Sequence, residues 1–326
     1  MLKTEGKSQK IFEKKSLKNQ ALDFIMAGVG CNCLVALSES GVLERLVQTD
    51  GMREQELEVY DNPIALKSAL VTLEKCGVVE KIAKIFKITK FGRTLAEYIG
   101  LITIFFDGYA NLVANQSRIL KKKIKAPEKL VRWPVISKSS VRIAEKAVNP
   151  ILIEEVDKLG FSGTICDLGC GHGATLTRVC KRTGNPGLGF EGNSKTVFQA
   201  RRKIRDNIAI EVADITKLRG MWEDVVVLMQ AFVFHDFVPE SECISILDSY
   251  LDNFPNLKCF FYVDIVAPCS THDGLYPGFD YVHGLLGIPT RTYEETLEIF
   301  EQSKFKMVKE IPIPDLPNTF LWVLSP

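Results

Sequence analysis

The chain has 326 residues and a formal net charge of +1, which leaves room for two domains and excludes the strong positive charge of a general nucleic-acid binder. Its nine cysteines contain no C-x-x-C pair, which argues against a disulfide framework or a structural zinc site and for a reducing compartment. We find no apolar run that should span a membrane and no signal peptide, so we expect a cytoplasmic protein without membrane or nucleic-acid partners.

The first 150 residues predict a mainly helical domain. Apolar residues recur at helical spacing over residues 19–38 and again over residues 63–76, after which Gly77 ends the helix. Two short β-like runs follow between Val78 and Ile88. Helices followed by a two-stranded wing resemble a winged helix, a module that either contacts DNA or mediates dimerisation.

The wing carries four lysines that could contact phosphates, namely Lys81, Lys84, Lys87 and Lys90. The acidic residues Glu74 and Glu80 interrupt this stripe, which favours a solvated face over a DNA contact. Apolar helical faces in residues 21–46 and 66–73 exceed what one small domain can bury alone. We therefore expect the helices and the wing to form a homodimer.

Three further helices are predicted between the wing and the second half of the chain. They cover residues 101–124, which end in three lysines, then residues 135–148 and residues 150–159. We place the domain boundary near residue 150. The first domain then comprises residues 1–150, and the second comprises residues 151–326.

The second domain alternates between strand and helix patterns. Expected strands cover residues 164–167, 187–191, 208–212, 224–229, 258–266, 305–310 and 319–324. Expected helices cover residues 175–183, 194–204, 240–251 and 293–303. This alternation indicates an α/β domain with a doubly wound, mostly parallel sheet. The last two strands follow the last helix directly, as in an antiparallel hairpin.

The stretch from Asp167 to Ala174, D-L-G-C-G-H-G-A, places glycine at every second position after the first of these strands. Gly169, Gly171 and Gly173 allow a sharp turn and a close approach of a ligand, and the following helix offers free N–H groups. Gly169, Gly171 and Ala174 also match the dinucleotide fingerprint. A carboxylate at Asp167, however, would repel a pyrophosphate and attract a cation.

This stretch closely resembles the first motif of class I S-adenosylmethionine-dependent methyltransferases. S-adenosylmethionine has no phosphate and carries an ammonium and a sulfonium, which suits the acid at Asp167. The resemblance implies a Rossmann-like methyltransferase sheet, whose final antiparallel hairpin marks the family, and it favours S-adenosylmethionine over NAD. A structural turn without a ligand is the remaining alternative, and it is disfavoured because three close glycines cost chain entropy.

Four further residues at strand ends are candidates for the cofactor site. Glu191 lies about 20 residues after the first glycine, the spacing at which a carboxylate accepts hydrogen bonds from ribose hydroxyls. Asp214 and Ile215 follow the third strand, where the family reads the adenine amino group. Gln230 follows the fourth strand, where it would line the pocket. Glu191 and Asp214 could each instead be a surface acid.

A histidine–aspartate pair, His235 and Asp236, follows the fourth strand within the segment A-F-V-F-H-D-F. This segment resembles the one in O-methyltransferases whose histidine deprotonates a phenol or hydroxyl substrate. A histidine has a pKa near neutrality, which suits general-base catalysis. The alternative is a buried structural histidine.

A second histidine, His283, lies in residues 276–287, an apolar segment with several glycines after the fifth strand. The chain has only four histidines. His172 lies in the glycine turn and His272 in a polar loop, so His235 and His283 are both expected at the carboxyl edge of the sheet. Two imidazoles and a carboxylate make a facial site for non-haem iron or another transition metal such as zinc.

This pairing of histidines resembles the 2-oxo acid C-methyltransferases, which methylate the β-carbon of phenylpyruvate, 2-ketoarginine and similar acids. The resemblance implies a metal that binds the carboxylate and keto oxygens of the substrate and stabilises the enolate. His235, Asp236 and His283 would then be the catalytic and metal-binding residues. Asp236 could instead be an outer-shell partner or cap the next helix. A guanidinium on the substrate could meet one of four acids, Asp107, Asp264, Asp280 and Glu294.

Two other functions remain open. A small-molecule O-methyltransferase would use His235 as a general base and need no metal. A winged-helix regulator would only sense a ligand, and the complete α/β domain disfavours it.

Overall fold

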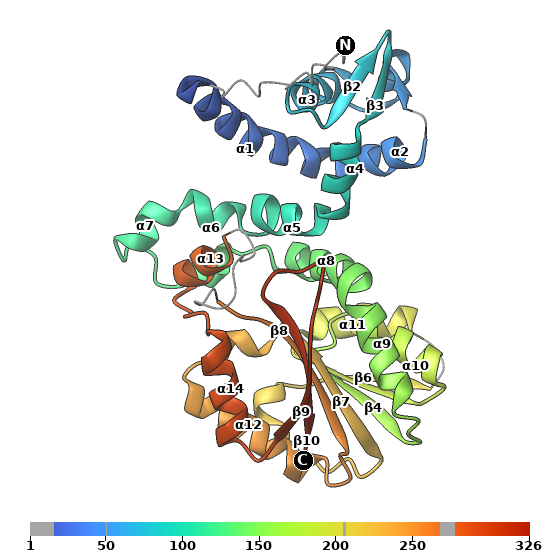
Figure 1. The fold of residues 1–326 in the computed structure, drawn as a ribbon, viewed down its shortest axis with the longest axis vertical. Helices are drawn as coiled ribbons and strands as arrows, with labels where there is room; N and C mark the ends of the chain where they lie inside the picture. Colours follow the sequence, from blue (N-terminus) through green and yellow to red (C-terminus); the bar gives the residue numbers. More distant parts are fainter. Residues whose placement is uncertain (1–15, 50, 205–206, 268–277) are drawn as a thin grey trace, which may run out of the picture. The chain divides into compact units, whose positions relative to one another are not determined.

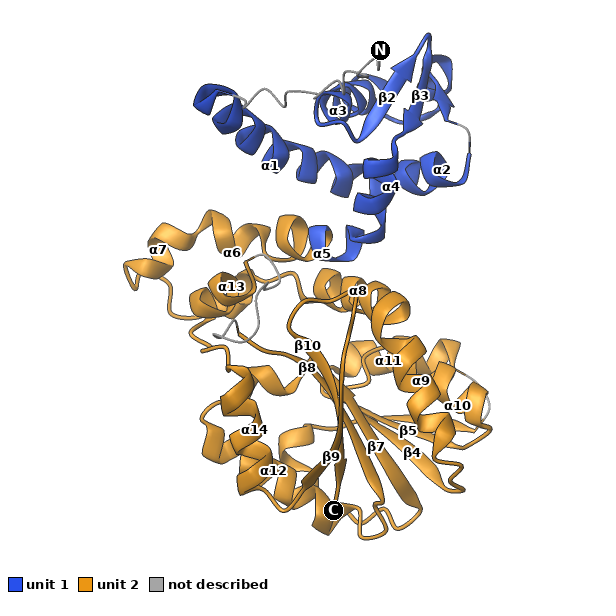
Figure 2. Ribbon diagram, viewed as in Figure 1, with its two compact units in different colours: residues 1–102 blue, residues 103–326 orange. Residues whose placement is uncertain are grey.

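The structure is a computed structural model that describes residues 16–49, 51–204, 207–267 and 278–326. The chain divides into two compact units, residues 1–102 and residues 103–326 (Figure 2). The division lies well before the boundary expected near residue 150, because the helices that follow residue 102 pack within the larger unit.

The smaller unit combines helices with a small antiparallel sheet (Figure 1). Its elements are α1 Leu17–Glu39, α2 Val42–Gln48, β1 Met52–Arg53, the 3-10 helix Glu54–Val59, α3 Pro63–Lys75, β2 Val79–Ile82, β3 Ile85–Ile88 and α4 Lys90–Glu97. Asn62 caps α3 by accepting from the backbone N–H of Ala65, and Pro63 opens the helix. The predicted wing is present as β2 and β3, and β1 adds a third strand in the order β1-β3-β2.

One lysine of the wing pairs with an acid of the same unit. Lys81 pairs with Glu54 at 3.1 Å and lies over the Phe86 ring, and Lys67 pairs with the same carboxylate. One of the four wing lysines is therefore already paired with a protein carboxylate.

Helix α1 is longer than the sequence analysis expected. It runs without a break through Gly28 and Gly30. By length and composition it is apolar enough to cross a membrane, with a mean hydropathy of 1.7 in its most apolar window. This finding corrects the expectation that no apolar run reaches that length. Its C-terminal half packs into the unit through Leu34, Val35 and Leu37, whereas Phe24 and other apolar side chains of its first half are exposed.

The predicted long helix over residues 101–124 is divided into short pieces. They are α5 Ile99–Thr103, a π-helical turn Ile104–Gly108, α6 Ala110–Ala114 and α7 Gln116–Leu120. A Cβ at Gly108 would lie 2.3 Å from Cδ1 of Ile136, so the turn needs glycine for this close approach. The Asn115 amide donates to the Asn111 carbonyl and accepts from Arg118, which competes with helix continuation.

Further helices precede the main sheet in the chain. They are the 3-10 helix Pro127–Leu130, α8 Trp133–Ile143, the π-helical turn Ala144–Val148 and α9 Asn149–Lys158. The remaining helices are α10 Ala174–Thr183, α11 Ser194–Lys203, α12 Glu240–Asn253, α13 Phe279–Leu286 and α14 Tyr293–Gln302, with short 3-10 turns at Ile215–Lys217 and Phe234–Asp236. Helix α13 was not predicted.

The larger unit is built on a seven-stranded sheet in the order β6-β5-β4-β7-β8-β10-β9. Its strands are β4 Thr164–Leu168, β5 Gly187–Glu191, β6 Ile208–Val212, β7 Val225–Ala231, β8 Cys259–Ile265, β9 Lys306–Pro312 and β10 Thr319–Ser325. The first five are parallel, and β10 is antiparallel to both β8 and β9. This confirms the α/β fold and the closing hairpin.

Helices cover both faces of this sheet (Figure 1). On one face, α12 and α14 contribute Leu247, Tyr250 and Phe300 to a core that also contains Trp322 of β10. On the other face, α11 packs Val197 and Ala200 against Ile210 of β6. Because both faces are buried, the carboxyl edge of the parallel strands is the natural place for ligands.

Candidate active site

The glycine turn follows β4 directly and leads into α10. All three glycines have positive φ, at +80° for Gly169, +54° for Gly171 and +72° for Gly173. A Cβ at Gly169 would lie 2.9 Å from a methyl of Val233, and one at Gly173 would lie 2.4 Å from Cδ1 of Ile204. The turn therefore needs glycine for its backbone conformation and, at its two ends, for space.

Two acids meet at this turn. Glu191, at the end of β5, accepts from the backbone N–H of Gly171 at 3.1 Å and from that of Asn193 at 2.7 Å. Asp167 is buried in β4, and burial, together with the negative charge of Glu191, raises its pKa to about 7. A buried carboxyl beside a second carboxylate suits a cationic ligand, because a nearby positive charge would offset both the burial of the Asp167 carboxylate and its repulsion by Glu191.

Gln230 lies at the same edge, near the end of β7. Its side chain is only 2% exposed, and neither amide atom has a hydrogen-bond partner among the described residues. Buried polar atoms are nearly always paired, so an unpaired amide in this position suits a bound ligand.

Asp214 and Ile215 have structural partners of their own. The Asp214 carboxylate caps a 3-10 turn by accepting from the backbone N–H of Thr216 at 3.0 Å and from its hydroxyl at 2.7 Å. The side chain of Ile215 is buried in the core, and its carbonyl accepts from Tyr250. These contacts leave Asp214 more than half exposed.

His235 lies in the short 3-10 turn after β7 and is fixed by Asp264 of the neighbouring strand β8. The imidazole Nδ1 lies 2.6 Å from Oδ1 of Asp264, and the backbone N–H of His235 donates to Oδ2 at 3.0 Å. Asp264 is 2% exposed and also accepts from the Tyr262 hydroxyl and the Ile265 N–H. Because a carboxylate accepts, Nδ1 carries the proton and Nε2 is directed away from Asp264.

His283 is held in the same way by its own helix. It lies on α13, is 4% exposed, and its Nδ1 is 2.8 Å from the carbonyl oxygen of Phe279. A carbonyl can only accept, so Nδ1 donates and Nε2 keeps its lone pair. Both histidines therefore have one nitrogen fixed and the other available.

The two available nitrogens converge on Asp236. Oδ1 of Asp236 lies 3.8 Å from Nε2 of His235 and 4.0 Å from Nε2 of His283. One ligand atom from each of the three residues lies within 4.8 Å of the others. The helix-capping alternative for Asp236 is wrong, because α12 begins after Pro239 and has no side-chain cap.

The charges of the two imidazoles are linked. Burial lowers the pKa of His235, but the Asp264 carboxylate outweighs it and raises the pKa to about 9. Burial, and then the charge on His235, lower the pKa of His283. At neutral pH without a metal, the pair therefore carries one proton more than two neutral imidazoles do, and that extra proton lies on Nε2 of His235.

This donor set fits a transition metal. Histidines that bind metals usually donate their second nitrogen to a carboxylate or a backbone carbonyl, as His235 and His283 do here. Two imidazoles and one carboxylate with open positions form the facial triad of non-haem iron sites, and the same donors also bind zinc. A bound metal would take the place of the proton on the pair.

Sequence reasoning missed the role of Asp264 and two groups near the histidines. Asp264 was considered only as a partner for a guanidinium, although an acid near the end of an otherwise apolar strand is a detectable signal. Phe279 lies with its ring centroid 5.4 Å from that of His235 and 4.0 Å from that of His283. Arg291 is buried, and its guanidinium donates to the carbonyl of Phe234, which precedes His235.

Other candidates have separate partners. Asp107 pairs with Arg132, and Asp280 accepts from the Thr290 hydroxyl at 2.6 Å. His172 lies 3.2 Å from the Gln199 amide oxygen. His272, like residues 276 and 277 of the second histidine segment, lies outside the described residues.

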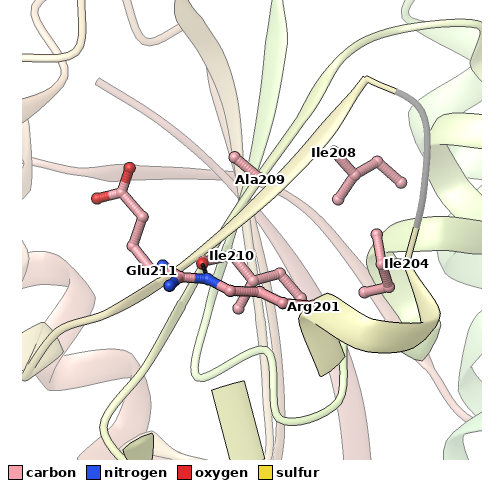
Figure 3. Close-up of a pocket in the computed structure, with 6 residues that line it drawn as sticks. All are labelled: Arg201, Ile204, Ile208, Ala209, Ile210 and Glu211. Carbon is pink, nitrogen blue, oxygen red and sulfur yellow. Dashed lines mark hydrogen bonds between the residues drawn. The ribbon is translucent and has the colours of Figure 1, made fainter. Parts of the chain in front are cut away.

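A hollow of about 210 Å³ lies at the sheet edge formed by β6 (Figure 3). It is lined by Arg201, Ile204, Ile208, Ala209, Ile210 and Glu211. Arg201 donates from Nε to the carbonyl of Ile210 at 2.6 Å. None of the predicted site residues lines this hollow.

Known proteins resemble the chain in sequence and in fold. No protein-family model matches it. It is 30% identical over 272 residues to an indolepyruvate C-methyltransferase from Streptomyces griseus, and the match covers 81% of each chain.

Three solved structures share the fold at low sequence identity. Mitomycin 7-O-methyltransferase MmcR has a TM-score of 0.67 and 15% identity, and the match covers 94% of this chain and 97% of that one. The methyltransferase CalO1 of calicheamicin biosynthesis, with S-adenosylhomocysteine bound, has a TM-score of 0.65, 17% identity and coverages of 96% and 100%. Human N-acetylserotonin methyltransferase with S-adenosylmethionine has a TM-score of 0.68, 12% identity and coverages of 96% and 99%.

Proposed function

The chain belongs to the class I S-adenosylmethionine-dependent methyltransferases, and we propose that it transfers the methyl group to C3 of a 2-oxo acid at a metal centre. One observation carries the proposal: His235 and His283 each have Nδ1 occupied and direct Nε2 toward Asp236. The likeness to an indolepyruvate C-methyltransferase supports a 2-oxo acid as the acceptor.

The glycine turn is the proposed site of the cofactor. Asp167 would face the positive charges of S-adenosylmethionine, and Glu191 would accept from the ribose hydroxyls. The two unpaired amide atoms of Gln230 would form hydrogen bonds with the same ligand. Asp214 and Ile215 remain proposed neighbours of the adenine.

His235, Asp236 and His283 are the proposed ligands of a non-haem iron or zinc ion. Such an ion supplies Lewis acidity to the carboxylate and keto oxygens of a 2-oxo acid. The chain's own part is to fix the donors: Asp264 orients His235, and the Phe279 carbonyl orients His283.

The reaction balances as a proton loss followed by a methyl gain. The C3–H bond breaks, and its electron pair forms the enolate. The proton passes to Oδ2 of Asp236, the carboxylate oxygen that is not used toward the histidines. The enolate carbon then attacks the methyl carbon of the sulfonium. A C3–CH₃ bond forms, the S–CH₃ bond breaks, and its electrons remain on the sulfur of S-adenosylhomocysteine. The keto group is restored.

The surroundings favour an aromatic substrate side chain over a guanidinium. The Phe279 ring packs against both histidines. Two of the four acids considered for a guanidinium are held by other groups, Asp264 by His235 and Asp280 by Thr290. Asp107 pairs with Arg132 through Oδ1, and its Oδ2 is buried without a partner among the described residues. We therefore propose phenylpyruvate or indolepyruvate as the substrate type.

A second candidate is O-methylation with His235 as the base. The short contact between His235 and Asp264 favours it, since a carboxylate behind an imidazole stabilises the protonated form that a base must reach. A pKa of about 9, however, leaves His235 protonated at neutral pH when no metal is bound, and a protonated imidazole is no base.

Replacing either histidine tests the proposal. His235→Ala and His283→Ala should each lose the co-purified metal, because a site with open positions keeps few donors after one is removed. Both should also lose turnover on phenylpyruvate, and their affinity for S-adenosylmethionine should stay near that of the wild type. Glu298→Ala, at an exposed position of α14 outside the proposed site, is the control and should keep metal and turnover. If the wild type purifies without metal and His283→Ala stays active, the results favour O-methylation instead.

A further inference from the structure

We propose that the hydroxyl of Tyr109 is a further catalytic group of this site and donates a hydrogen bond to the enolate oxygen of the substrate. The inference rests on the proposed C3 methylation. It adds a residue from the segment before α6, far in sequence from both histidines.

The ring of Tyr109 is fixed beside the histidines. Its backbone N–H donates to the carbonyl of Ile104 at 2.9 Å, which closes the π-helical turn. The residue is 5% exposed and belongs to an apolar cluster with Leu112 and with Val282 and Leu285 of α13. Helix α13 also carries His283, so the same packing places Tyr109 and His283 together. π-Helical turns of this kind are frequent at functional sites.

Within the part of the chain that the structure describes, the Tyr109 hydroxyl makes no hydrogen bond, so it is available to a ligand at the site. Its ring meets the His283 ring edge-on, with the centroids 6.5 Å apart. Burial, and then the negative charge of Asp236, raise the pKa of Tyr109.

A phenol at this position acts as a donor. Its ordinary pKa is about 10, so it keeps its proton at neutral pH. Negative charge develops on the keto oxygen when the C3 proton leaves, and it disappears when the methyl group arrives. A donor aimed at that oxygen stabilises the enolate more than the ketone, and loss of one such donor typically costs about 10²–10³ in kcat.

The test compares Tyr109→Phe with wild type. The substitution keeps the ring and its packing and removes only the hydroxyl. We expect kcat on phenylpyruvate to fall about 100-fold, with KM, metal content and affinity for S-adenosylmethionine close to wild type. Tyr293→Phe is the matched control, since it removes a hydroxyl that donates to Glu310 instead, and it should keep wild-type kcat.

Oxalate gives a second readout that needs no turnover. Its planar dianion presents two oxygens as the enolate of a 2-oxo acid does, and calorimetry should show weaker binding to Tyr109→Phe than to wild type. Wild-type kcat in Tyr109→Phe overturns the inference, as does a loss of kcat that parallels a loss of metal. If wild type methylates no 2-oxo acid, the proposed function fails and oxalate decides alone: weaker binding to the variant keeps the Tyr109 contact, and equal or absent binding overturns it.

Discussion

The geometry of this site depends on the hydrogen-bond partners of its candidate ligands. The three candidate ligands were predicted from the sequence. Their geometry depends on Asp264 and on the Phe279 carbonyl, which fix Nδ1 of His235 and of His283. Without these partners each ring could turn, and the converging Nε2 atoms would be lost. The groups that orient a ligand are thus as much part of the site as the ligands.

Asp167 predicts a pH dependence of cofactor binding. Its pKa of about 7 in the free protein is raised, so below pH 7 it holds a proton. The cationic cofactor needs the ionised form, and the proton must leave on binding. We expect the Kd for S-adenosylmethionine to rise about tenfold for each pH unit below 7, as one linked proton requires.

Calorimetry between pH 5.5 and pH 8 measures this dependence. Asp167→Asn is the control, because an amide does not titrate; it should bind weakly with little change over this range. A wild-type Kd that is constant with pH would separate Asp167 from the cofactor.

At the scale of elements, α1 predicts the assembly. Phe24 is 84% exposed and Ile25 61% exposed, and Leu17 and Leu22 are exposed on the same half of the helix. A group of several large apolar side chains exposed to water marks a surface that another molecule covers. A homodimer through this half of α1 is the proposal that matches the sequence expectation.

The double substitution Phe24→Glu and Ile25→Glu tests it. Two carboxylates at such a surface should turn a dimer into a monomer by light scattering, while circular dichroism stays unchanged because neither side chain packs in the unit. Lys306→Glu, at an exposed position of the edge strand β9 in the larger unit, is the charge control and should stay dimeric. A wild type that is monomeric at micromolar concentration would remove the dimer and leave the exposed face to another partner.

Elements also show how far the sequence could go. The strand and helix alternation predicted the sheet, because buried parallel strands and amphipathic helices have distinct periods. The break of residues 101–124 was missed, because it depends on the close approach of Gly108 to Ile136 and on the side chain of Asn115. Both contacts are invisible to an apolar periodicity, which continues across the break.

At the scale of the whole molecule, the strand order explains contacts between distant residues that the sequence alone did not predict. His235 and Asp264 are 29 residues apart and meet because β7 and β8 are neighbours in the sheet. His283 reaches the same point from α13, a helix that the sequence did not predict. The carboxyl-edge rule predicted that these residues lie at one edge, but their contacts required the fold.

The position of the transferred methyl group tests the central claim most directly. Wild-type protein with its metal, phenylpyruvate and S-adenosylmethionine carrying a ¹³C-methyl group would be followed by NMR spectroscopy. We predict a methyl signal split by the single proton on C3, which marks a new carbon–carbon bond. An unsplit methoxy signal, from a methyl group on oxygen, would contradict C3 methylation.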